Sequence, residues 1–313
     1  MTHSKPSVVF ALDQSFLIPG TVAVFSLLKN HPDKSIRIYL ISGDEDPIWI
    51  QPLVNLIREM GSEPVLKSVS KALVSDLKIN LHFSQAIFYR LFVADLIEEQ
   101  RVIYLDSDLL VHGNLDELWE INLGNFPLAA VPDPMIQDFE RIGLSSHEGY
   151  FNSGVLVMDL DRWRKMDLGK GVRDFIQENP DAISYPDQCG LNAILKGNWY
   201  RLSPEWNVQT GFMDEKPKAF SELYFPKEVL DESIKNPKVV HFTGSFKPWN
   251  MGSDHPFKFL FWKYLRQTPY SKTLPLDFSF LNLLKSIFPI ALKRKYWRYL
   301  NRKQGSKQLS RIA

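Results

Sequence analysis

The sequence predicts an α/β protein built around a mostly parallel, doubly wound β-sheet with flanking helices. Strand-like apolar runs alternate with helix-like segments through the first part of the chain, and this alternation is typical of parallel βαβ units. A length of 313 residues accommodates one large α/β domain followed by a tail. No glycine-rich G-x-G-x-x-G or Walker loop follows the first apolar run, so we expect any nucleotide to be bound in another way.

The expected elements follow one another in a regular order. Residues 7–12 form a buried strand with Asp13 at its carboxyl end, which is where ligands bind in open α/β sheets. A helix over residues 18–29, a strand over 36–41, a helix over 48–60 that stops near Gly61, and a short strand near Val65 complete the first series. A helix over residues 84–98 leads into the next strand, and further strands are expected at 150–159 and 239–241.

The composition sets limits on the class of protein. Hydrophobic residues make up 44% and charged residues 23% of the chain, as in soluble globular proteins. The net charge of +1 gives no overall attraction to nucleic acid. A single cysteine, Cys189, excludes an intrachain disulfide and fits a reducing compartment. The chain starts without the features of a signal peptide, and no apolar run approaches the roughly 20 residues needed to span a bilayer. We therefore expect a cytosolic protein.

Residues 101–111 carry the two side chains on which the functional hypothesis depends. An apolar run is followed by Asp106 and Asp108. Alternate side chains of an extended strand share a face, so both carboxylates can reach one point, where they repel each other unless a cation lies between them. Such oxygen ligands suit Mg²⁺ or Mn²⁺, and either ion would carry a phosphorylated substrate. The alternative is a pair of solvated turn aspartates at the end of a strand.

Four further polar residues lie next to apolar segments. Arg90 is either a surface arginine that buries its stem or a group that faces a phosphate or sugar. Asn152, in a run of small residues, can hydrogen-bond to a sugar hydroxyl, although Asn-Ser-Gly is also a common turn. Asp187 and Gln188 lie at or just before the start of a helix, and an N-cap role is the alternative for Asp187.

A second informative stretch begins where a short apolar strand ends at His241. A histidine is a suitable third ligand for Mn²⁺. In the same loop, Gly244 permits close approach of the backbone and Lys247 supplies a positive charge for a diphosphate. A lone histidine is more often structural, but this one shares its loop with a glycine, a lysine and a tryptophan.

Taken in order, these segments resemble the family 8 retaining glycosyltransferases. That family includes bacterial lipopolysaccharide and lipooligosaccharide galactosyl- and glucosyltransferases, with glycogenin as a distant relative. The resemblance runs from about residue 7 to residue 270 and implies a single Rossmann-like nucleotide-sugar-binding domain with the GT-A fold. It rests on six motifs in the same order, namely A-x-D, S-x-A-x-F-Y-R-L, L-D-S-D, F-N-S-G-V, P-D-Q-x-x-L-N and H-F-x-G-x-x-K-P-W.

The resemblance also implies a role for each matching position. Asp106, Asp108 and His241 would hold Mn²⁺, with Mg²⁺ as the other option. The uridine pocket would be lined by Ala11, Asp13 and Phe16, with the ring of Phe16 in the stacking place, and Ser107 would touch the ribose or base. The diphosphate would be bound by Gly244 and Lys247. The donor sugar would face Arg90, Asn152, Asp187 and Gln188.

One position departs from the pattern of the family. Many bacterial members read D-Q-D where this chain has Cys189 as the third residue, whereas glycogenin-type members also lack that last aspartate. The departure leaves the contacts to the sugar and acceptor open.

The implied reaction is transfer of galactose or glucose from UDP-galactose or UDP-glucose to a hydroxyl of a glycan acceptor, with retention of configuration. The metal and Lys247 would stabilise charge on the leaving diphosphate. Retention requires a double displacement or a front-face attack. The family places Gln188 beneath the sugar, and an amide oxygen is a poor nucleophile. We therefore favour front-face attack, in which a β-phosphate oxygen takes the acceptor proton and Gln188 supports the oxocarbenium-like state.

The last part of the chain has a different character. We divide the sequence into a catalytic domain at residues 1–270 and a basic amphipathic tail at 271–313, in which ten Lys and Arg residues face one acid, Asp277. Basic residues interleaved with Trp and Tyr suit an anionic membrane surface and a lipid-linked acceptor. A disordered tail, a helix packed on the domain, or RNA contact are the alternatives. We expect a cytoplasmic enzyme that is peripheral to the membrane and does not bind nucleic acid.

Two other functions stay open at this point. A sugar-phosphate nucleotidyltransferase also uses carboxylate-bound metal on a Rossmann-like sheet, but it would normally carry a glycine-rich basic loop after the first strand. A catalytically silent, membrane-bound sensor of nucleotide sugars is the third possibility.

Overall fold

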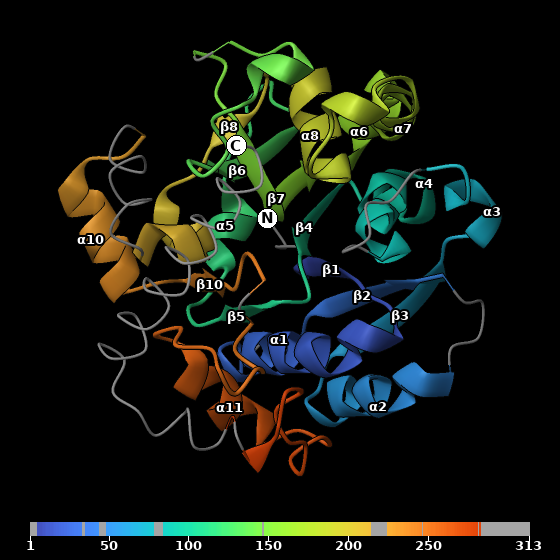
Figure 1. The fold of residues 1–313 in the computed structure, drawn as a ribbon. Helices are drawn as coiled ribbons and strands as arrows, with labels where there is room; N and C mark the ends of the chain where they lie inside the picture. Colours follow the sequence, from blue (N-terminus) through green and yellow to red (C-terminus); the bar gives the residue numbers. More distant parts are fainter. Residues whose placement is uncertain are drawn as a thin grey trace, which may run out of the picture.

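The computed structural model describes residues 5–32, 35–43, 48–77, 84–145, 147–213, 224–245, 247–280 and 282. Within these parts, strands form a seven-stranded sheet in the order β3-β2-β1-β4-β7-β6-β8 and a three-stranded sheet in the order β5-β10-β9 (Figure 1). The strands are β1 (Ser7–Ala11), β2 (Arg37–Ser42), β3 (Glu63–Ser68), β4 (Arg101–Leu105), β5 (Leu109–Val111), β6 (Leu128–Pro132), β7 (Phe151–Asp159), β8 (Tyr200–Arg201), β9 (Val208–Gln209) and β10 (Val239–His241).

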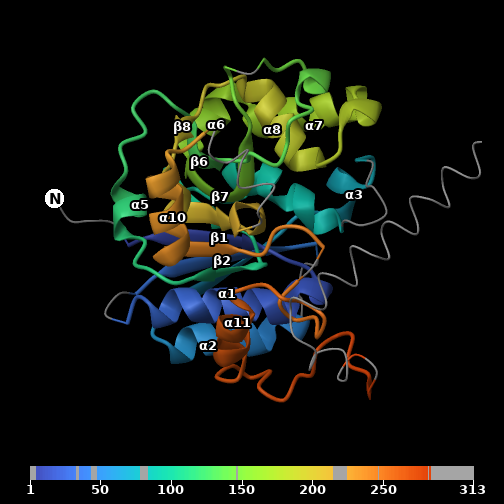
Figure 2. The ribbon, with the colours of Figure 1, turned by 60° about the vertical axis from the view of Figure 1, so that its left-hand side comes forward.

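Helices cover both faces of the large sheet, with α1, α2 and α11 on one side and α6, α7 and α8 on the other (Figure 2). The α-helices are α1 (Leu17–Lys29), α2 (Gln51–Glu59), α3 (Lys71–Val74), α4 (Val93–Leu96), α5 (Asp116–Glu120), α6 (Leu160–Met166), α7 (Leu168–Glu178), α8 (Pro186–Leu195), α10 (Lys227–Lys235) and α11 (Lys258–Leu265). Short 3₁₀ helices are η1 (Gln14–Phe16), η2 (Ile48–Ile50), η3 (Gln85–Phe92), η4 (Glu140–Ile142), η5 (Pro180–Ala182), η6 (Pro204–Asn207) and η7 (Thr210–Met213).

The central sheet is mostly parallel, as the sequence predicts. Strands β3, β2, β1 and β4 are mutually parallel, whereas β7 runs antiparallel to both β4 and β6. Because of this reversal, the start of β7 lies at the same edge of the sheet as the carboxyl ends of β1 and β4. The predicted stop after α2 is also confirmed, since Gly61 has a positive φ of 78°.

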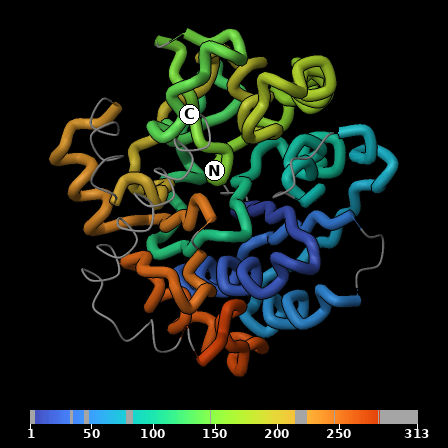
Figure 3. Tube along the Cα trace, viewed as in Figure 1, coloured from blue at the N-terminus to red at the C-terminus, as the bar shows by residue number. Residues whose placement is uncertain are grey.

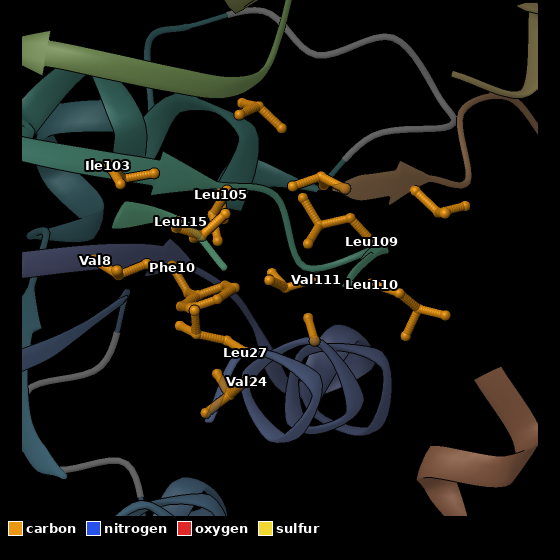
Figure 4. Packing of buried hydrophobic residues seen from close by; sticks show 14 of the residues in the cluster. Val8, Phe10, Val24, Leu27, Ile103, Leu105, Leu109, Leu110, Val111 and Leu115 are labelled. Atoms are coloured by element: carbon orange, nitrogen blue, oxygen red, sulfur yellow. The ribbon is translucent and has the colours of Figure 1, made fainter. Parts of the chain in front are cut away.

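A buried core lies on each face of the sheet, and successive side chains of a strand alternate between the two. On β1, Val8 and Phe10 point into one buried cluster and Val9 into the other, as the period of two requires. Figure 4 shows the first cluster, in which side chains of β1 and β4 pack against Val24 and Leu27 of α1. Both faces are therefore apolar, and this explains why the strands read as nearly continuous hydrophobic runs.

Strand β7 contains an irregularity that bears on the site. Its pairing with β6 shifts from Leu156 opposite Ala130 to Phe151 opposite Pro132. Five residue steps on β7 therefore span two on β6, so β7 is bulged between these pairs. Such bulges are frequent next to active sites. The small residues 152–154 lie inside this bulge.

Segments far apart in sequence close one side of the molecule. Helix α11 lies beside α1 (Figure 3), where the rings of Tyr264 and Phe25 meet edge to face at 5.9 Å. The segment after α11 turns back, and the Asp277 carboxylate accepts hydrogen bonds from the backbone N–H groups of Met251 (2.5 Å) and Gly252 (3.3 Å). Across the described ranges, no helix has the length and apolar character needed to cross a membrane. The rest of the expected tail, residues 281 and 283–313, lies outside the described residues.

Candidate active site

The paired aspartates lie in a bend, so the expectation that they sit in an extended strand was wrong. Strand β4 ends at Leu105, and Asp106 and Asp108 occupy the turn that carries the chain to β5 in the smaller sheet. Backbone hydrogen bonds fix this bend, because Asp106 N–H donates to the Gly154 carbonyl (2.8 Å) and Phe242 N–H donates to the Asp108 carbonyl (3.0 Å). The two carboxylates still converge, because the bend brings them together and not the alternation of side chains along a strand.

His241 completes a cluster of three potential metal ligands. It ends β10, which lies beside β5 (Figure 1). The two strands pair antiparallel, with His241 opposite Leu109. Ligand atoms of Asp106, Asp108 and His241 lie within 4.8 Å of one another. The imidazole Nε2 is 3.2 Å from Asp108 Oδ1 and 3.7 Å from Asp106 Oδ2. The sequence-predicted triad therefore comes together in space.

The donor set of this cluster fits a divalent cation such as Mn²⁺ or Mg²⁺. His241 Nδ1 lies 3.0 Å from Asn207 Oδ1, so Nδ1 carries a proton and the neutral ring presents the lone pair of Nε2 to Asp106 and Asp108. Two carboxylates and an imidazole lone pair then face one another, and a cation between them relieves the repulsion.

Arg90 compensates part of this negative charge. It is only 5% exposed, so the interpretation as a surface arginine was wrong. Its Nη2 pairs with Asp106 Oδ1 at 2.7 Å, its Nε pairs with Asp187 Oδ2 at 2.9 Å, and its Nη1 donates to the Ser153 carbonyl at 2.6 Å. Burial raises the pKa of Asp106, and Arg90 opposes that rise. Because Asp187 lies within α8 and pairs with Arg90, the alternative that it caps the helix was also wrong.

Lys247 is the second cation of the site. Its Nζ lies 2.5 Å from Asp108 Oδ2. Burial opposes ionisation of Asp108, but the positive charge of Lys247 outweighs it and helps to hold the pKa of that carboxyl below its usual range. Gly244, three residues earlier, has a φ of +82° with nothing within 4 Å of an added Cβ. Backbone conformation, more than close contact, therefore favours glycine there.

A glycine in β7 makes room for the histidine. A Cβ added at Gly154 would lie 2.2 Å from His241 Cε1, 2.7 Å from His241 Nδ1 and 2.8 Å from Asp106 Oδ2. Real Cβ contacts are not this short, so only glycine permits the observed approach.

The predicted sugar-facing residues form one buried hydrogen-bond network. Gln188 Oε1 accepts from Ser153 N–H (3.0 Å), while Gln188 Nε2 donates to Asp133 Oδ2 (3.1 Å). Asn152 Nδ2 donates to the same Asp133 oxygen (3.2 Å), and Asn152 Oδ1 accepts from Asn207 Nδ2 (2.9 Å). Burial raises the pKa of Asp133, and the amide donors oppose that rise. The network continues through Asn207 to the metal-ligand cluster.

The predicted uridine residues lie at the end of β1. Ser107 Oγ donates to the Ala11 carbonyl (3.0 Å), which joins this end of β1 to the bend of the aspartates. Asp13 caps η1, because its Oδ1 accepts from the backbone N–H of Phe16 (3.1 Å). The ring of Phe16 meets Trp249 edge to face at 6.1 Å. No direct contact joins Asp13 or Phe16 to the metal-ligand cluster among the contacts described.

The residue that departs from the family pattern is buried in the core next to this network. Cys189 is 1% exposed, belongs to the apolar cluster beneath α8, and has its Sγ 3.1 Å from the hydroxyl oxygen of Tyr150. The thiol is thus engaged in the core.

Sequence reasoning missed Asp133 and Asn207. Asp133 follows directly after β6, which is the same arrangement of an acid after an apolar strand that singled out Asp13, so it was detectable. Asn207 ends a 3₁₀ helix and carries no pattern of its own. Its role arises only from partners brought together by the fold.

Comparison with known proteins gives a consistent result. Residues 7–252 match the model of the family described as "Glycosyl transferase family 8". General stress protein A of Bacillus subtilis (strain 168) is 32% identical over 253 residues, which cover 79% of this chain and 88% of that protein. Lipopolysaccharide 1,2-glucosyltransferase of Escherichia coli (strain K12) is 26% identical over 93% of this chain and 84% of that protein.

Several streptococcal glycosyltransferases are longer relatives, and the chain spans only 30–62% of their length. Among solved structures, the galactosyltransferase LgtC in complex with donor and acceptor sugar analogs superposes with a TM-score of 0.74 at 25% identity. The alignment covers 87% of this chain and 98% of LgtC. The central sheet and flanking helices match the GT-A fold of that enzyme.

Proposed function

The chain belongs to glycosyl transferase family 8, and from this membership we propose that it transfers a hexose, galactose or glucose, from a UDP-sugar to a hydroxyl of a glycan acceptor with retention of configuration. The cluster of Asp106, Asp108 and His241 is the observation that carries the proposal. It gives a diphosphate-bearing donor a cation to bind. A silent sensor would bind the same donor without releasing UDP, and the donor screen below separates the two.

The charge of the site supports a divalent ion, for which we propose Mn²⁺, with Mg²⁺ as the alternative. The site holds four carboxylates and two cationic side chains, a formal charge of −2 with histidine neutral. Ion pairs join Asp106, Asp108, Asp187, Arg90 and Lys247, and Asp133 is linked to them through Gln188. When bound, the ion supplies Lewis-acid stabilisation of a diphosphate leaving group. Lys247 adds a positive charge next to it, and Gly244 shapes the loop that carries Lys247.

The donor sugar is assigned to the network around Gln188. Its amide oxygen already accepts the Ser153 N–H and its amide nitrogen already donates to Asp133. An amide held in this way is a poor nucleophile, and this supports front-face attack over double displacement. Asp187 orients Arg90, and Asn152 presents its amide beside Gln188, so we propose that Arg90, Asn152, Asp187 and Gln188 all face the sugar. For the nucleotide, we propose Ala11, Asp13, Phe16 and Ser107.

We propose that the acceptor is a cell-surface glycan that carries a lipid anchor, because a relative of this chain is a lipopolysaccharide glucosyltransferase. Residues 1–270 would form the catalytic domain, and residues 271–313 would attach it to an anionic membrane surface from the cytoplasmic side. Large apolar side chains at the start of this tail support attachment, since 51–76% of their surface is exposed in Leu274, Leu276, Phe278 and Phe280.

A donor screen tests the proposal. The enzyme is incubated with Mn²⁺ and each of several UDP-sugars, with and without a lipid-linked glycan, and released UDP is measured. We expect release from UDP-galactose or UDP-glucose that rises with acceptor. The Asp108→Asn variant should stay folded and lose nearly all transfer, because it removes one ligand charge. Absence of UDP release with every donor, or unchanged activity of the variant, would contradict the assignment.

A further inference from the structure

Asn207 lies between the metal-ligand cluster and the sugar-facing amides. It is fully buried, at 0% exposure, and therefore touches no substrate. It ends η6, directly before β9, and β9 pairs in parallel with β10 so that the strand ending in His241 runs alongside. Its Oδ1 lies 3.0 Å from His241 Nδ1, and its Nδ2 lies 2.9 Å from Asn152 Oδ1.

The direction of each hydrogen bond follows from a backbone group. Gly154 N–H can only donate, and it donates to Asn152 Oδ1 at 3.0 Å. The other amide atom of Asn152 must then be nitrogen, which agrees with its contact to the Asp133 carboxylate at 3.2 Å. Asn207 must present its NH₂ group to Asn152 Oδ1, and so it presents its oxygen to His241.

It follows that His241 carries a proton on Nδ1. In the neutral ring this leaves Nε2 with a lone pair that faces Asp106 and Asp108. Without Asn207 the opposite tautomer would become favourable, because an Nε2–H could donate to Asp108 Oδ1, 3.2 Å away. That proton would occupy the atom needed for a metal.

We propose that Asn207 is a positioning residue that sets the tautomer of His241 for metal binding and, through the same amide, fixes the orientation of Asn152 beside the donor sugar. The metal-binding part rests on the proposed function, since it treats His241 as a ligand. The tautomer itself does not depend on a metal being present.

Two variants separate the contacts of Asn207. Asn207→Leu removes both hydrogen bonds while keeping the same branched arrangement of side-chain heavy atoms. Asn207→Asp keeps an acceptor for His241 Nδ1 but sets a carboxylate oxygen against Asn152 Oδ1. As a control, Asn30→Leu removes a comparable amide whose Nδ2 donates to the carbonyls of Ser26 (2.8 Å) and Val111 (2.9 Å), outside the site.

Two measurements read the outcome. The first is the ¹⁵N spectrum of histidine-labelled protein without metal, at a pH that keeps the ring neutral, with His241 assigned by comparison with His241→Asn. The second is Mn²⁺ affinity by calorimetry. We expect the Nδ1–H tautomer in the wild type, in Asn207→Asp and in Asn30→Leu, and the Nε2–H tautomer in Asn207→Leu. The Mn²⁺ dissociation constant should rise about 10- to 100-fold in Asn207→Leu and stay unchanged in Asn30→Leu.

The two proposals fail in different ways. If Asn207→Leu keeps the wild-type tautomer and Mn²⁺ affinity, the positioning role is overturned, whereas the proposed function stands as long as the wild type binds Mn²⁺. If the tautomer switches but the wild type binds no Mn²⁺, Asn207 does position His241 and the metal assignment is wrong. Should Asn207→Leu not fold, Asn207→Asp decides the issue, because an Nε2–H tautomer there would overturn the proposal.

Discussion

Replacement of Gly154 by alanine is the most direct perturbation of the metal-ligand cluster. The added Cβ would lie 2.2 Å from His241 Cε1, whereas ordinary contacts begin near 3.4 Å. The ring must retreat by about 1.2 Å to reach ordinary contact with the added Cβ. The ring cannot do so freely, because Asn207 and Asp108 hold its two nitrogens at 3.0 and 3.2 Å.

The displacement is large compared with what a metal site tolerates. Ligand distances need to stay within about 0.2 Å of their usual values, so we expect the Mn²⁺ affinity of Gly154→Ala to fall by about 10- to 100-fold. Overpacking typically costs about 1–3 kcal/mol of stability, and the folded state should survive that. Mn²⁺ titration by calorimetry, together with denaturant unfolding, measures both effects.

Gly171→Ala is the matched control. It makes the same chemical change inside α7, where an added Cβ meets nothing within 4 Å. Alanine there should raise helix stability by about 0.5–1 kcal/mol without any effect on Mn²⁺ binding. The geometry indicates that Mn²⁺ binding depends on the position of His241. If Gly154→Ala binds Mn²⁺ as tightly as the wild type and the control do, this dependence is refuted.

Three further predictions follow from other parts of the chain. Gln188→Ala should lower the turnover rate more than it weakens UDP binding, because Gln188 is assigned to the transferring sugar; an equal fall in UDP affinity, measured by calorimetry, would place it elsewhere. Burial lowers the pKa of His255 to about 4 from 6.5, so the unfolded chain takes up this proton first and stability falls as pH drops below 6.5. Between pH 7 and pH 5, the free energy of unfolding of His255→Asn should therefore fall by about 2 kcal/mol less than that of the wild type, as measured by denaturant unfolding. An identical pH dependence of the two proteins would refute this. Removal of residues 283–313 keeps Asp277 on its loop but deletes nine of the ten basic residues of the tail, so the enzyme should stay folded and float much less with anionic vesicles at low salt, whereas undiminished flotation would show that these basic residues are not the anchor.

Much of the fold is predictable because the spacing of apolar residues along the chain reflects which side chains are buried. Strands β1, β2 and β4 have alternate side chains that fill two cores, so their composition is diagnostic. The helix predicted over residues 84–98 is instead a 3₁₀ helix followed by four α-helical residues. Five consecutive residues there, 88–92, are buried, and tertiary packing on all sides overrides local propensity. The antiparallel direction of β7 is also absent from the sequence, because composition does not encode strand direction.

Part of the candidate site was predictable from short motifs, and part arises only from the fold. The metal-ligand triad was predictable, because carboxylates and histidine at strand ends carry a chemical signature in short motifs. Asn207 was not identifiable, since it acts through Asn152, 55 residues away in the chain, and such a partnership exists only after folding. Asparagine is also common in turns, so its residue type adds no signal. Asp133 was overlooked although its place directly after β6 carries one.

The bulge in β7 gives this site a scaffold made of main chain. Where the strand loses its partner on β6, its released peptide groups take up site residues instead. Ser153 N–H binds Gln188 and the Ser153 carbonyl binds Arg90, while on the other edge of the strand the Gly154 carbonyl accepts Asp106 N–H next to the β4 pairing. Peptide groups are the same whatever side chain they bear. The number of residues between the two flanking pairs is therefore a quantity that divergence among related chains must preserve, and a deletion there would misalign three binding groups at once.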